Sequence, residues 1–540
     1  MKRPSEAQGA LAGLIVSAPL TAIFLLTATL GLPDTVSDLF YFLRDSLPGN
    51  LLPIGVQILK NSLLMLGFSL IETAKTAEQV MGVGMFLGAL VVAVAVYFFV
   101  TRWRGLRPDY RGGLTLGLAV GAPMMLIVNA KDINASASMA VSAMWTLIAF
   151  AGWGALVQWI HQRLDTPDPA SGQAMSVEQI DRRRFLIRAG ASSAAITVVG
   201  AGLNAALATS LAKAPPVAQG GDSATAAVGP KDLPNMDAEL KPAPGTRPEY
   251  TPLEDHYRID ITLNYPRVAE AGWTLPISGL VDKPLNLTLA QLKTYPKMEQ
   301  FVTLACISNE VGGELIGTTK WTGVSVQKVL ADAGVKTEAL YMALEAADGF
   351  FETVSLETIA KDERVMFTYA WDDQPLLEEH GFPLRIYIPD RYGMKQPKWI
   401  TQAKIVAEYN EGYWVRRGWD EVARMNATSV IDTVAVDSPV KDAQGQTLIP
   451  VGGIAHAGAR SVSKVEVKVD DGPWTAAALR KPLSTTTWVI WRFDWPMQPG
   501  NHTFYVRCVD GQGVPQDERV AGVLPSGATG IDSMRANVGG

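Results

Sequence analysis

The 540-residue chain contains only two cysteines and five histidines. Two cysteines exclude a disulfide framework, a four-cysteine metal site and a cysteine-ligated iron–sulfur cluster. A haem inside a membrane generally needs paired axial ligands on facing helices, often histidines, and His161 alone lies near an apolar run. We therefore expect neither haem nor an iron–sulfur cluster.

Charged residues are also scarce: they make up 19% of the chain, against 48% hydrophobic residues, and the mean hydropathy is +0.12. A net charge of −6 argues against a nucleic-acid partner. Uncharged runs of about 20 residues can cross a bilayer as helices. Five such runs cover residues 9–33, 80–101, 112–130, 133–160 and 189–212. Residues 51–71 are apolar too, but Lys60 and Asn61 interrupt them, which favours an interfacial or re-entrant helix.

Basic residues give the expected orientation of these runs. They lie before the first run, after the second and before the fifth, so these three loops are expected in the cytoplasm. Arg182-Arg183-Arg184 before the fifth run is typical of a twin-arginine export signal, and an ordinary positive-inside anchor is the alternative. We therefore predict a multi-pass bacterial protein of the inner (cytoplasmic) membrane, with lipid as a partner and the part after residue 212 on the periplasmic side.

Differences in composition divide the whole chain into five regions. Residues 1–212 form the transmembrane region, and residues 213–252, rich in Pro, Ala and Gly, predict a flexible linker. Residues 253–425 mix helical and strand-like patterns without a regular βαβ period, which predicts an α+β domain. Residues 426–525 contain short alternating strands, which predict an immunoglobulin-like β-sandwich before a tail at 526–540. The clearest strand-like runs are 259–263, 383–388, 465–469, 487–493 and 502–509.

Cys306 lies where a predicted strand runs into the small-residue turn Ser308 to Gly313. A thiolate at a strand end can offer one bond to a soft metal that is held mainly by other ligands. A lone cysteine is also common as a small buried core residue, which is how we interpret Cys508. A disulfide between Cys306 and Cys508 would remove the Cys306 thiolate as a metal ligand, so we do not expect one.

Several motifs follow in a characteristic order. They are Cys306-Ile307-Ser308-Asn309 with Gly312-Gly313, Trp321-Thr322-Gly323-Val324, His380-Gly381-Phe382-Pro383-Leu384-Arg385, Tyr392-Gly393-Met394-Lys395 and Lys398-Trp399-Ile400. Together they resemble the sulfite-oxidase family of molybdopterin enzymes from about residue 257 to 419. Gly453-Ile454-Ala455 and Asp471-Gly472-Pro473-Trp474 extend the resemblance to that family's C-terminal immunoglobulin-like domain.

The resemblance implies a molybdenum–molybdopterin cofactor and oxygen-atom transfer, with Cys306 as the metal ligand. The family's cofactor-binding positions fall on Tyr257, Arg258, Cys306, Asn309, His380, Arg385, Lys395 and Lys398. A buried phosphate needs charge-assisted hydrogen bonds, which favours Arg385 because apolar neighbours flank it. A solvated basic face is the alternative, especially for Lys395 in a loop. Sulfite oxidases have Arg-x-His where this chain has Arg258-Ile259-Asp260.

The expected substrate is a small molecule, neutral or organic. Sulfite is a dianion that needs cations around it, and sulfite oxidases place arginines directly after the motif asparagine. Glu310 and Val311 stand there in this chain, and Trp419 occupies roughly the place of a pocket tyrosine. We therefore expect Cys306, Glu310 and Trp419 at the catalytic centre and a substrate of the sulfoxide type, with an external cytochrome or quinone-linked electron carrier.

Two alternatives stay open. One is a sulfite dehydrogenase whose pocket cations come from elsewhere in the fold. The other is a non-catalytic, membrane-tethered binding protein. In this family the sandwich often supports dimerisation, so a homodimer is a candidate assembly in either case.

Overall fold

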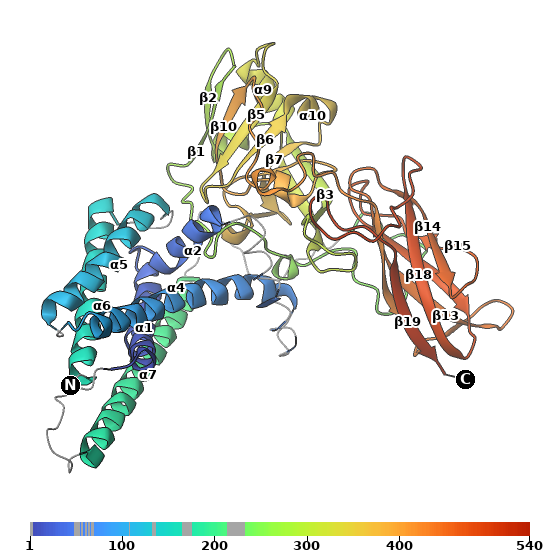
Figure 1. The fold of residues 1–540 in the computed structure, drawn as a ribbon. Coiled ribbons are helices and arrows are strands. Elements are labelled where there is room, and N and C mark those ends of the chain that lie inside the picture. Colours follow the sequence, from blue (N-terminus) through green and yellow to red (C-terminus); the bar gives the residue numbers. More distant parts are fainter. Residues whose placement is uncertain are drawn as a thin grey trace. The chain divides into compact units, whose positions relative to one another are not determined.

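The computed structural model describes residues 4–47, 70–106, 109–131, 137–164, 175–212 and 233–539, with isolated positions between 48 and 69 (Figure 1). Contacts divide the chain into two units. One contains the N-terminal helices. The other contains residues 233–261 and 265–539.

The regular elements in the described part of the N-terminal unit are all helices. Its helices are α1 (Glu6–Ala28), α2 (Thr35–Ser46), α4 (Leu70–Trp103), α5 (Tyr110–Lys131), α6 (Met139–Leu164) and α7 (Met175–Ala212). Helix α1 begins after Ser5 because the Ser5 hydroxyl accepts from the Gln8 amide while the Gln8 side chain accepts from the Ser5 amide. Helices α5 and α6 pack closely through glycines, since a Cβ on Gly154 would lie 2.2 Å from the Gly113 carbonyl oxygen.

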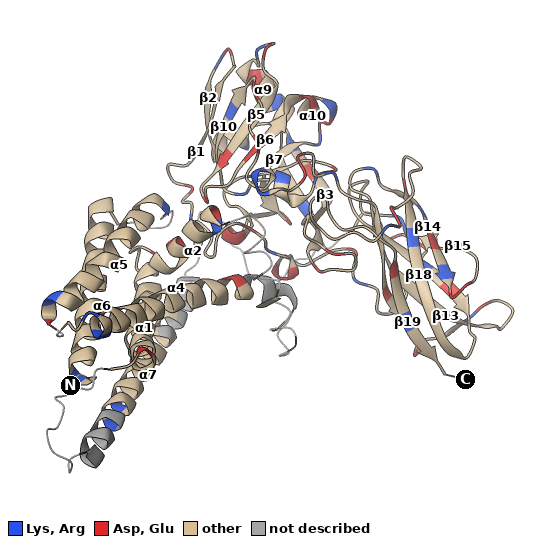
Figure 2. Ribbon diagram, in the orientation of Figure 1, with Lys and Arg blue, Asp and Glu red and all other residues tan. Residues whose placement is uncertain are grey.

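Five of these helices are long and apolar enough to cross a membrane, as the sequence predicts. The candidate spans are Glu6–Ala28, Thr76–Trp103, Tyr110–Lys131, Met139–Leu164 and Arg184–Asn204. Figure 2 shows few charged residues along these helices. Helix α7 starts before the three arginines 182–184, so the predicted fifth run is the C-terminal part of a longer helix. The expected helix at 51–71 falls almost wholly outside the described residues.

The second unit begins with two five-stranded sheets. One has the order β2-β1-β10-β5-β6, and the other has the order β3-β4-β7-β8 with β9 paired to β7. The strands are β1 (Thr274–Gly279), β2 (Leu285–Thr288), β3 (Lys297–Ala305), β4 (Ile316–Ser325), β5 (Tyr341–Ala346), β6 (Phe351–Ser355), β7 (Met366–Trp371), β8 (Gln374–Pro375), β9 (Arg385–Tyr387) and β10 (Ile400–Val406). The helices are α8 (Leu289–Leu292), α9 (Val326–Ala333) and α10 (Leu356–Lys361), with 3₁₀ turns at Leu253–Asp255, Glu378–His380, Gly393–Lys395 and Val415–Arg417.

Local patterns explain most of these elements. Helix α9 buries Val326, Val329, Leu330 and Ala333 on one face and ends at Gly334, whose φ of +68° suits glycine. The strand expected at 259–263 is absent from this described segment. Asp260 there forms ion pairs with Arg258 and Lys398 and does not take part in a sheet ladder.

Two further sheets follow, with the orders β11-β13-β17-β16 and β15-β14-β18-β19; β12 pairs with β13. Their strands are β11 (Thr428–Val434), β12 (Val440–Lys441), β13 (Thr447–His456), β14 (Val462–Val469), β15 (Thr475–Ala476), β16 (Ala478–Leu479), β17 (Val489–Pro496), β18 (Gly500–Asp510) and β19 (Asp532–Val538). Side chains from both sheets, Trp491 and Phe504 among them, share one core that also contains Cys508. Strand β19 lies in the expected tail and pairs with β18.

Residues 233–252, which belong to the predicted linker, make specific polar contacts with the C-terminal part of the chain. The Asn235 amide donates to the Lys481 carbonyl at 2.6 Å, and Arg480 pairs with Glu249 at 3.0 Å. Both contacts join this segment to the stretch next to β16. The remainder of the predicted linker, 213–232, lies outside the described residues.

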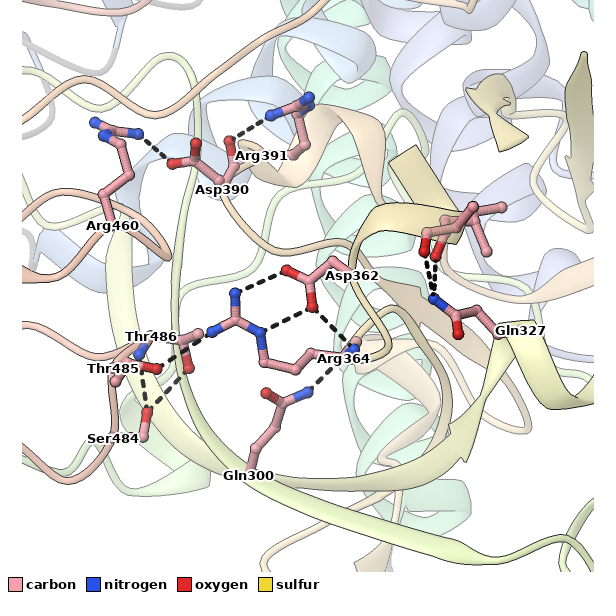
Figure 3. A network of polar contacts seen from close by, with 12 residues as sticks. Gln300, Gln327, Asp362, Arg364, Asp390, Arg391, Arg460, Ser484, Thr485 and Thr486 are labelled. Atoms are coloured by element: carbon pink, nitrogen blue, oxygen red, sulfur yellow. Dashed lines mark hydrogen bonds and ion pairs between the residues drawn. The ribbon is translucent and has the colours of Figure 1, made fainter. Parts of the chain in front are cut away.

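Polar contacts join the C-terminal sheets to the sheet that contains β3. The Thr303 amide donates to the Thr486 carbonyl at 3.0 Å, and the Trp488 amide donates to the Thr303 hydroxyl at 2.8 Å. Figure 3 shows two neighbouring contacts, Arg364 with Thr485 and Arg460 with Asp390. These bonds fix the end of β3, where Cys306 follows.

Candidate active site

Cys306 is the first residue after β3 and is buried. The β3–β4 ladder ends at the Ala305–Ile316 pair, after which the Cys306 amide donates to the Leu315 carbonyl at 2.9 Å. The Cys306 sulfur lies 3.0 Å from the Ser308 hydroxyl. The side chain packs in a cluster with Tyr257 and Trp321, so it faces the residues described next.

Asn309 closes the loop after Cys306. Its side-chain oxygen accepts from the Leu315 amide at 2.8 Å. A Cβ on Gly313 would lie 2.5 Å from that oxygen, which is why a glycine is needed there. The structure therefore gives Asn309 a loop-closing role, and the direct cofactor contact that the resemblance implies stays a prediction.

Arg385 is a fully buried cation between two tryptophans. Its guanidinium carbon lies 4.7 Å from the Trp321 ring centre and 4.9 Å from that of Trp371. It donates to the His380 carbonyl at 3.0 Å, and no carboxylate in the described chain forms an ion pair with it. Burial lowers the pKa of Arg385 to about 9, so it remains a cation at neutral pH.

Two histidine rings lie against the same tryptophan. The ring centres of His256 and His380 lie 4.8 and 4.9 Å from that of Trp371 and 5.6 Å from each other. Burial lowers the pKa of His256 to about 3 and that of His380 well below its usual value, and nearby Arg385 and Lys398 act in the same direction. Both rings are therefore neutral at pH 7.

Asp260 bridges the two remaining cations of this cluster. Its carboxylate lies 2.8 Å from Arg258 Nε and 3.2 Å from Lys398 Nζ. Burial lowers the pKa of Lys398 to about 8, and the nearby Asp260 opposes that shift. Tyr257, between Arg258 and His256 in the chain, is buried and stacks on the His256 ring at 5.1 Å.

The cluster has the donors that a buried phosphate requires. Among the described residues, Arg385 Nε and Arg258 Nη2 are buried donors without a hydrogen-bond partner, whereas the unpartnered His256 Nε2 is an acceptor because Nδ1 of the neutral ring donates to the Tyr257 carbonyl. Unpartnered donors on cations are costly in a protein interior, and an anion with several acceptor oxygens removes that cost. These residues fit the phosphate end of a molybdopterin, and Cys306 fits the single thiolate at its metal end. The described chain has no group of three or more His, Cys, Asp or Glu side chains suited to a metal, so Cys306 would be a lone protein ligand.

Lys395 has a different environment. Its ammonium lies 2.6 Å from the Glu352 carboxylate, and both side chains are almost completely buried. Burial raises the pKa of Glu352, and the charge of Lys395 opposes that rise. The structure thus places Lys395 in an internal ion pair, and its role as a cofactor contact stays a prediction.

We expect Lys395→Met to destabilise the cofactor-free protein by about 3–5 kcal/mol, because it leaves the Glu352 carboxylate buried and unpaired. Lys395→Met/Glu352→Gln should recover most of that loss. The free energy of unfolding in denaturant, measured for both variants and the wild type, checks this. If the single variant is as stable as the wild type, the ion pair has no structural role.

Glu310 and Trp419 both lie beside the loop that follows Cys306, and they share several neighbours. Glu310 is exposed and lines a small cavity together with Ala305, Tyr392 and Met425. Trp419 packs against a cluster that includes those same three residues. The structure thus brings both proposed pocket residues to one region beside the Cys306 loop.

Sequence reasoning missed several residues of this site. No motif marks His256, which is buried and packs so closely against Gly317 that a Cβ there would lie 2.8 Å from its ring. Trp371 carries no motif, and Asp260 was noted only as a departure from the family. A signal existed for Asp260, since a carboxylate two residues from Arg258 is placed to pair with it.

Comparisons with known proteins show which family this chain is similar to. Residues 262–414 match the family model described as the oxidoreductase molybdopterin binding domain. The chain is 33% identical over 147 residues to the uncharacterized oxidoreductase YuiH of Bacillus subtilis (strain 168), covering 27% of this chain and 72% of YuiH. It is 28% identical over 279 residues to the mitochondrial sulfite oxidase of Macaca fascicularis, covering 43% of this chain and 51% of that protein.

A third relative is the "Putative protein-methionine-sulfoxide reductase subunit YedZ1" of Azospira oryzae (strain ATCC BAA-33 / DSM 13638 / PS). It is 30% identical over 153 residues, which cover 28% of this chain and 56% of that protein. The chain spans about half the length of the sulfite oxidases that it matches. With its sheet-rich domain, its buried Cys306 and these relatives, the chain belongs to the family of molybdopterin-dependent oxidoreductases that includes sulfite oxidase.

Proposed function

We propose that this protein transfers an oxygen atom from a small, neutral organic substrate of the sulfoxide type while it is anchored in a membrane. The reaction would convert a sulfoxide, two electrons and two protons into a sulfide and water. An external electron carrier, a cytochrome or a quinone-linked protein, would supply the electrons. The observation that carries the proposal is the pair of buried, unpartnered donor nitrogens on Arg385 and Arg258, in the cluster that packs around Trp321 and Trp371 together with Cys306.

Each residue of the site has a definite task in this proposal. Bound molybdenum and its dithiolene would supply the two-electron redox chemistry. Cys306 binds the metal, while Arg258, Arg385 and Lys398 bind the phosphate end and the neutral His256 and His380 donate or accept hydrogen bonds beside it. The two tryptophans around Arg385 exclude water, which strengthens every charge-assisted bond there.

The charges next to the Cys306 loop support a neutral substrate. The cavity beside that loop contains the Glu310 carboxylate, and its one lining arginine, Arg247, is paired with Asp432 at 2.7 Å. An anion such as sulfite would meet a like charge there and no unpaired cation. The name of the YedZ1 relative points in the same direction, toward a sulfoxide.

We expect wild-type protein to use dimethyl sulfoxide with a higher kcat/KM than sulfite. Glu310→Gln should raise kcat/KM for sulfite by about two- to fivefold, because an exposed like charge costs that much in effective affinity, and should leave the value for dimethyl sulfoxide unchanged. Steady-state kinetics with an artificial electron donor or acceptor check both points. Faster turnover of sulfite than of the sulfoxide by the wild type would replace this proposal with a sulfite dehydrogenase.

The arrangement in the cell is part of the same proposal. Residues 1–212 would insert as a multi-pass region of the bacterial inner membrane, with the twin-arginine-like segment as its last anchor. Residues 253–425 would form the catalytic domain on the periplasmic side. The C-terminal sheets from residue 426 onward would form an immunoglobulin-like sandwich, extended to include β19, and would support a homodimer. Protease accessibility in spheroplasts and the mass of the detergent-solubilised protein test these points.

A further inference from the structure

An open groove in the second unit, with a volume of about 750 Å³, lies beside the Cys306 loop. Its walls come from the segment before His256, from the Cys306 loop and from strands β11 and β19. Apolar side chains line much of it, including those of Val311, Ile316, Val430, Trp488 and Met534. The groove therefore has room for side chains of another molecule and an apolar surface for them to contact.

The charges along this groove are predominantly negative. Among the described residues that line it are one guanidinium, that of Arg247, and four carboxylates, those of Asp255, Glu314, Asp432 and Asp532. Arg247 pairs with Asp432 at 2.7 Å, so its charge is neutralised within the wall. Asp255 and Glu314 are exposed. We call this feature the acidic groove. Apolar area with a polar, charged rim is typical of protein-docking surfaces, and the sign of the charge favours a cationic partner.

A short path of bonds joins the acidic groove to the proposed metal ligand. The Cys306 amide donates to the Leu315 carbonyl at 2.9 Å. The residues on either side of Leu315, Glu314 and Ile316, line the groove. Electrons tunnel through bonded and closely packed atoms, and the rate falls steeply with distance. A redox centre held in the groove would therefore have a direct connection to the Cys306 thiolate.

A second connection leads from the groove to the Arg385 cluster. Asp255, which lines the groove, directly precedes His256. Gly317, which follows the lining residue Ile316, lies so close to His256 that a Cβ there would be 2.8 Å from the ring. The ring centre of His256 in turn lies 4.8 Å from that of Trp371. The acidic groove is thus in packed contact with the residues that we expect around the cofactor.

We propose that the acidic groove is the docking site of a small, soluble electron-carrier protein whose redox centre lies within a positively charged face. The inference rests on the proposed function and deepens it, because it names the class of carrier and the place where it binds. In each encounter the carrier is oxidised by one electron, so two encounters supply the two electrons that reduction of a sulfoxide consumes. Such a carrier must bind and leave quickly, which suits a small, electrostatically guided contact.

Two matched probes test the docking: mitochondrial cytochrome c, which carries lysines around its exposed haem edge, and the same protein with its lysines succinylated. They share one haem and one fold but have opposite charge. At low ionic strength the detergent-solubilised, full-length protein should bind the native form at least about tenfold more tightly than the succinylated form. Isothermal calorimetry gives both affinities. The preference should shrink as salt is added, because salt screens charges at the surface.

Charge reversal within the groove tests the site itself. In Asp255→Lys/Glu314→Lys the affinity for native cytochrome c should fall about tenfold, and that for the succinylated form should rise. Both positions are exposed, so the variant should fold like the wild type. Glu338→Lys reverses an exposed carboxylate before β5, outside the groove, and should retain the wild-type preference. A general loss of stability would weaken binding of both forms and would not exchange the preference.

Electron transfer gives a second readout. When chemically reduced holoenzyme is mixed with ferric cytochrome c, one electron leaves the enzyme and the haem iron of the cytochrome passes from Fe(III) to Fe(II), which its absorbance reports. The second-order rate constant should fall about tenfold in Asp255→Lys/Glu314→Lys and stay unchanged in Glu338→Lys. Oxidation by benzoquinone, a small uncharged acceptor, should proceed at the same rate in all three proteins.

Other results would overturn the inference. Equal affinities for the two cytochrome forms in the wild type, or an unchanged preference in the double variant, would each do so. Weaker binding in the double variant with an unchanged rate of electron transfer would also do so, since electrons would then enter elsewhere.

The proposed function has its own result in these experiments. Charge-dependent electron transfer without turnover of any sulfoxide would leave the docking site standing and reject the sulfoxide reaction. Turnover of dimethyl sulfoxide with a viologen dye, but without charge-selective binding of cytochrome c, would keep the proposed function and reject the docking site.

Discussion

Cys306→Ser is expected to lower activity per bound molybdenum by at least about a hundredfold, since loss of even an outer-shell partner of a metal ligand can cost that much. The substitution should leave the fold unchanged, because serine has nearly the same size and can keep the contact with the Ser308 hydroxyl at 3.0 Å. The cofactor should stay bound through the Arg385 cluster. Activity, molybdenum and pterin content are measured on the same preparation.

Cys508→Ser is the matched control for this change. Cys508 is also buried, but it lies in the core between the C-terminal sheets, where its thiol contacts the Gln516 side chain at 3.3 Å. That variant should lose some stability and retain its activity per molybdenum. Full activity in Cys306→Ser would show that the thiolate is not the metal ligand, and the assignment of the site would fail.

Arg385→Met is expected to abolish binding of the cofactor while it stabilises the cofactor-free protein. Arg385 is a buried cation without a carboxylate partner in the described chain, so its desolvation is uncompensated until an anion binds. Replacing buried charges by apolar groups of similar volume often stabilises a protein, by about 1–4 kcal/mol. Molybdenum per chain and the free energy of unfolding of the cofactor-free form report the two effects.

Arg480→Met provides the contrast. Arg480 is buried like Arg385, but it pairs with Glu249 at 3.0 Å and bonds to the Leu240 carbonyl at 2.6 Å. Its loss leaves a buried carboxylate unpaired, so this variant should be less stable and should keep its molybdenum. If Arg385→Met retains full cofactor content, the buried cluster does not bind the phosphate end.

The sequence predicts the order of the domains along the chain better than it predicts the boundaries of their helices and strands. The apolar runs give the five candidate spans, and alternating patterns give β14 and β18, because these signals are local. Strand β19 lies within the predicted tail although Met534, Ala536 and Val538 alternate, because a single short strand with no turn signal after it has the composition of a tail. The segment 259–263 looks like a strand by composition, but ion pairs of Asp260 with two cations decide its conformation.

The site shows the same division between local and long-range information. Cys306, Arg385, His380 and Lys398 are recognised from short motifs. The contacts of Lys395 with Glu352 and of Arg385 with Trp371 depend on which strands become neighbours, which no local pattern reveals.

The most direct test of the whole account is the molybdenum content of the purified protein. The detergent-solubilised chain, matured in a host that makes the cofactor, should contain close to one molybdenum per chain by elemental mass spectrometry, with the fluorescence of oxidised pterin in the same sample. Absence of both signals would contradict the account and would favour a membrane-tethered protein that uses this fold for binding alone.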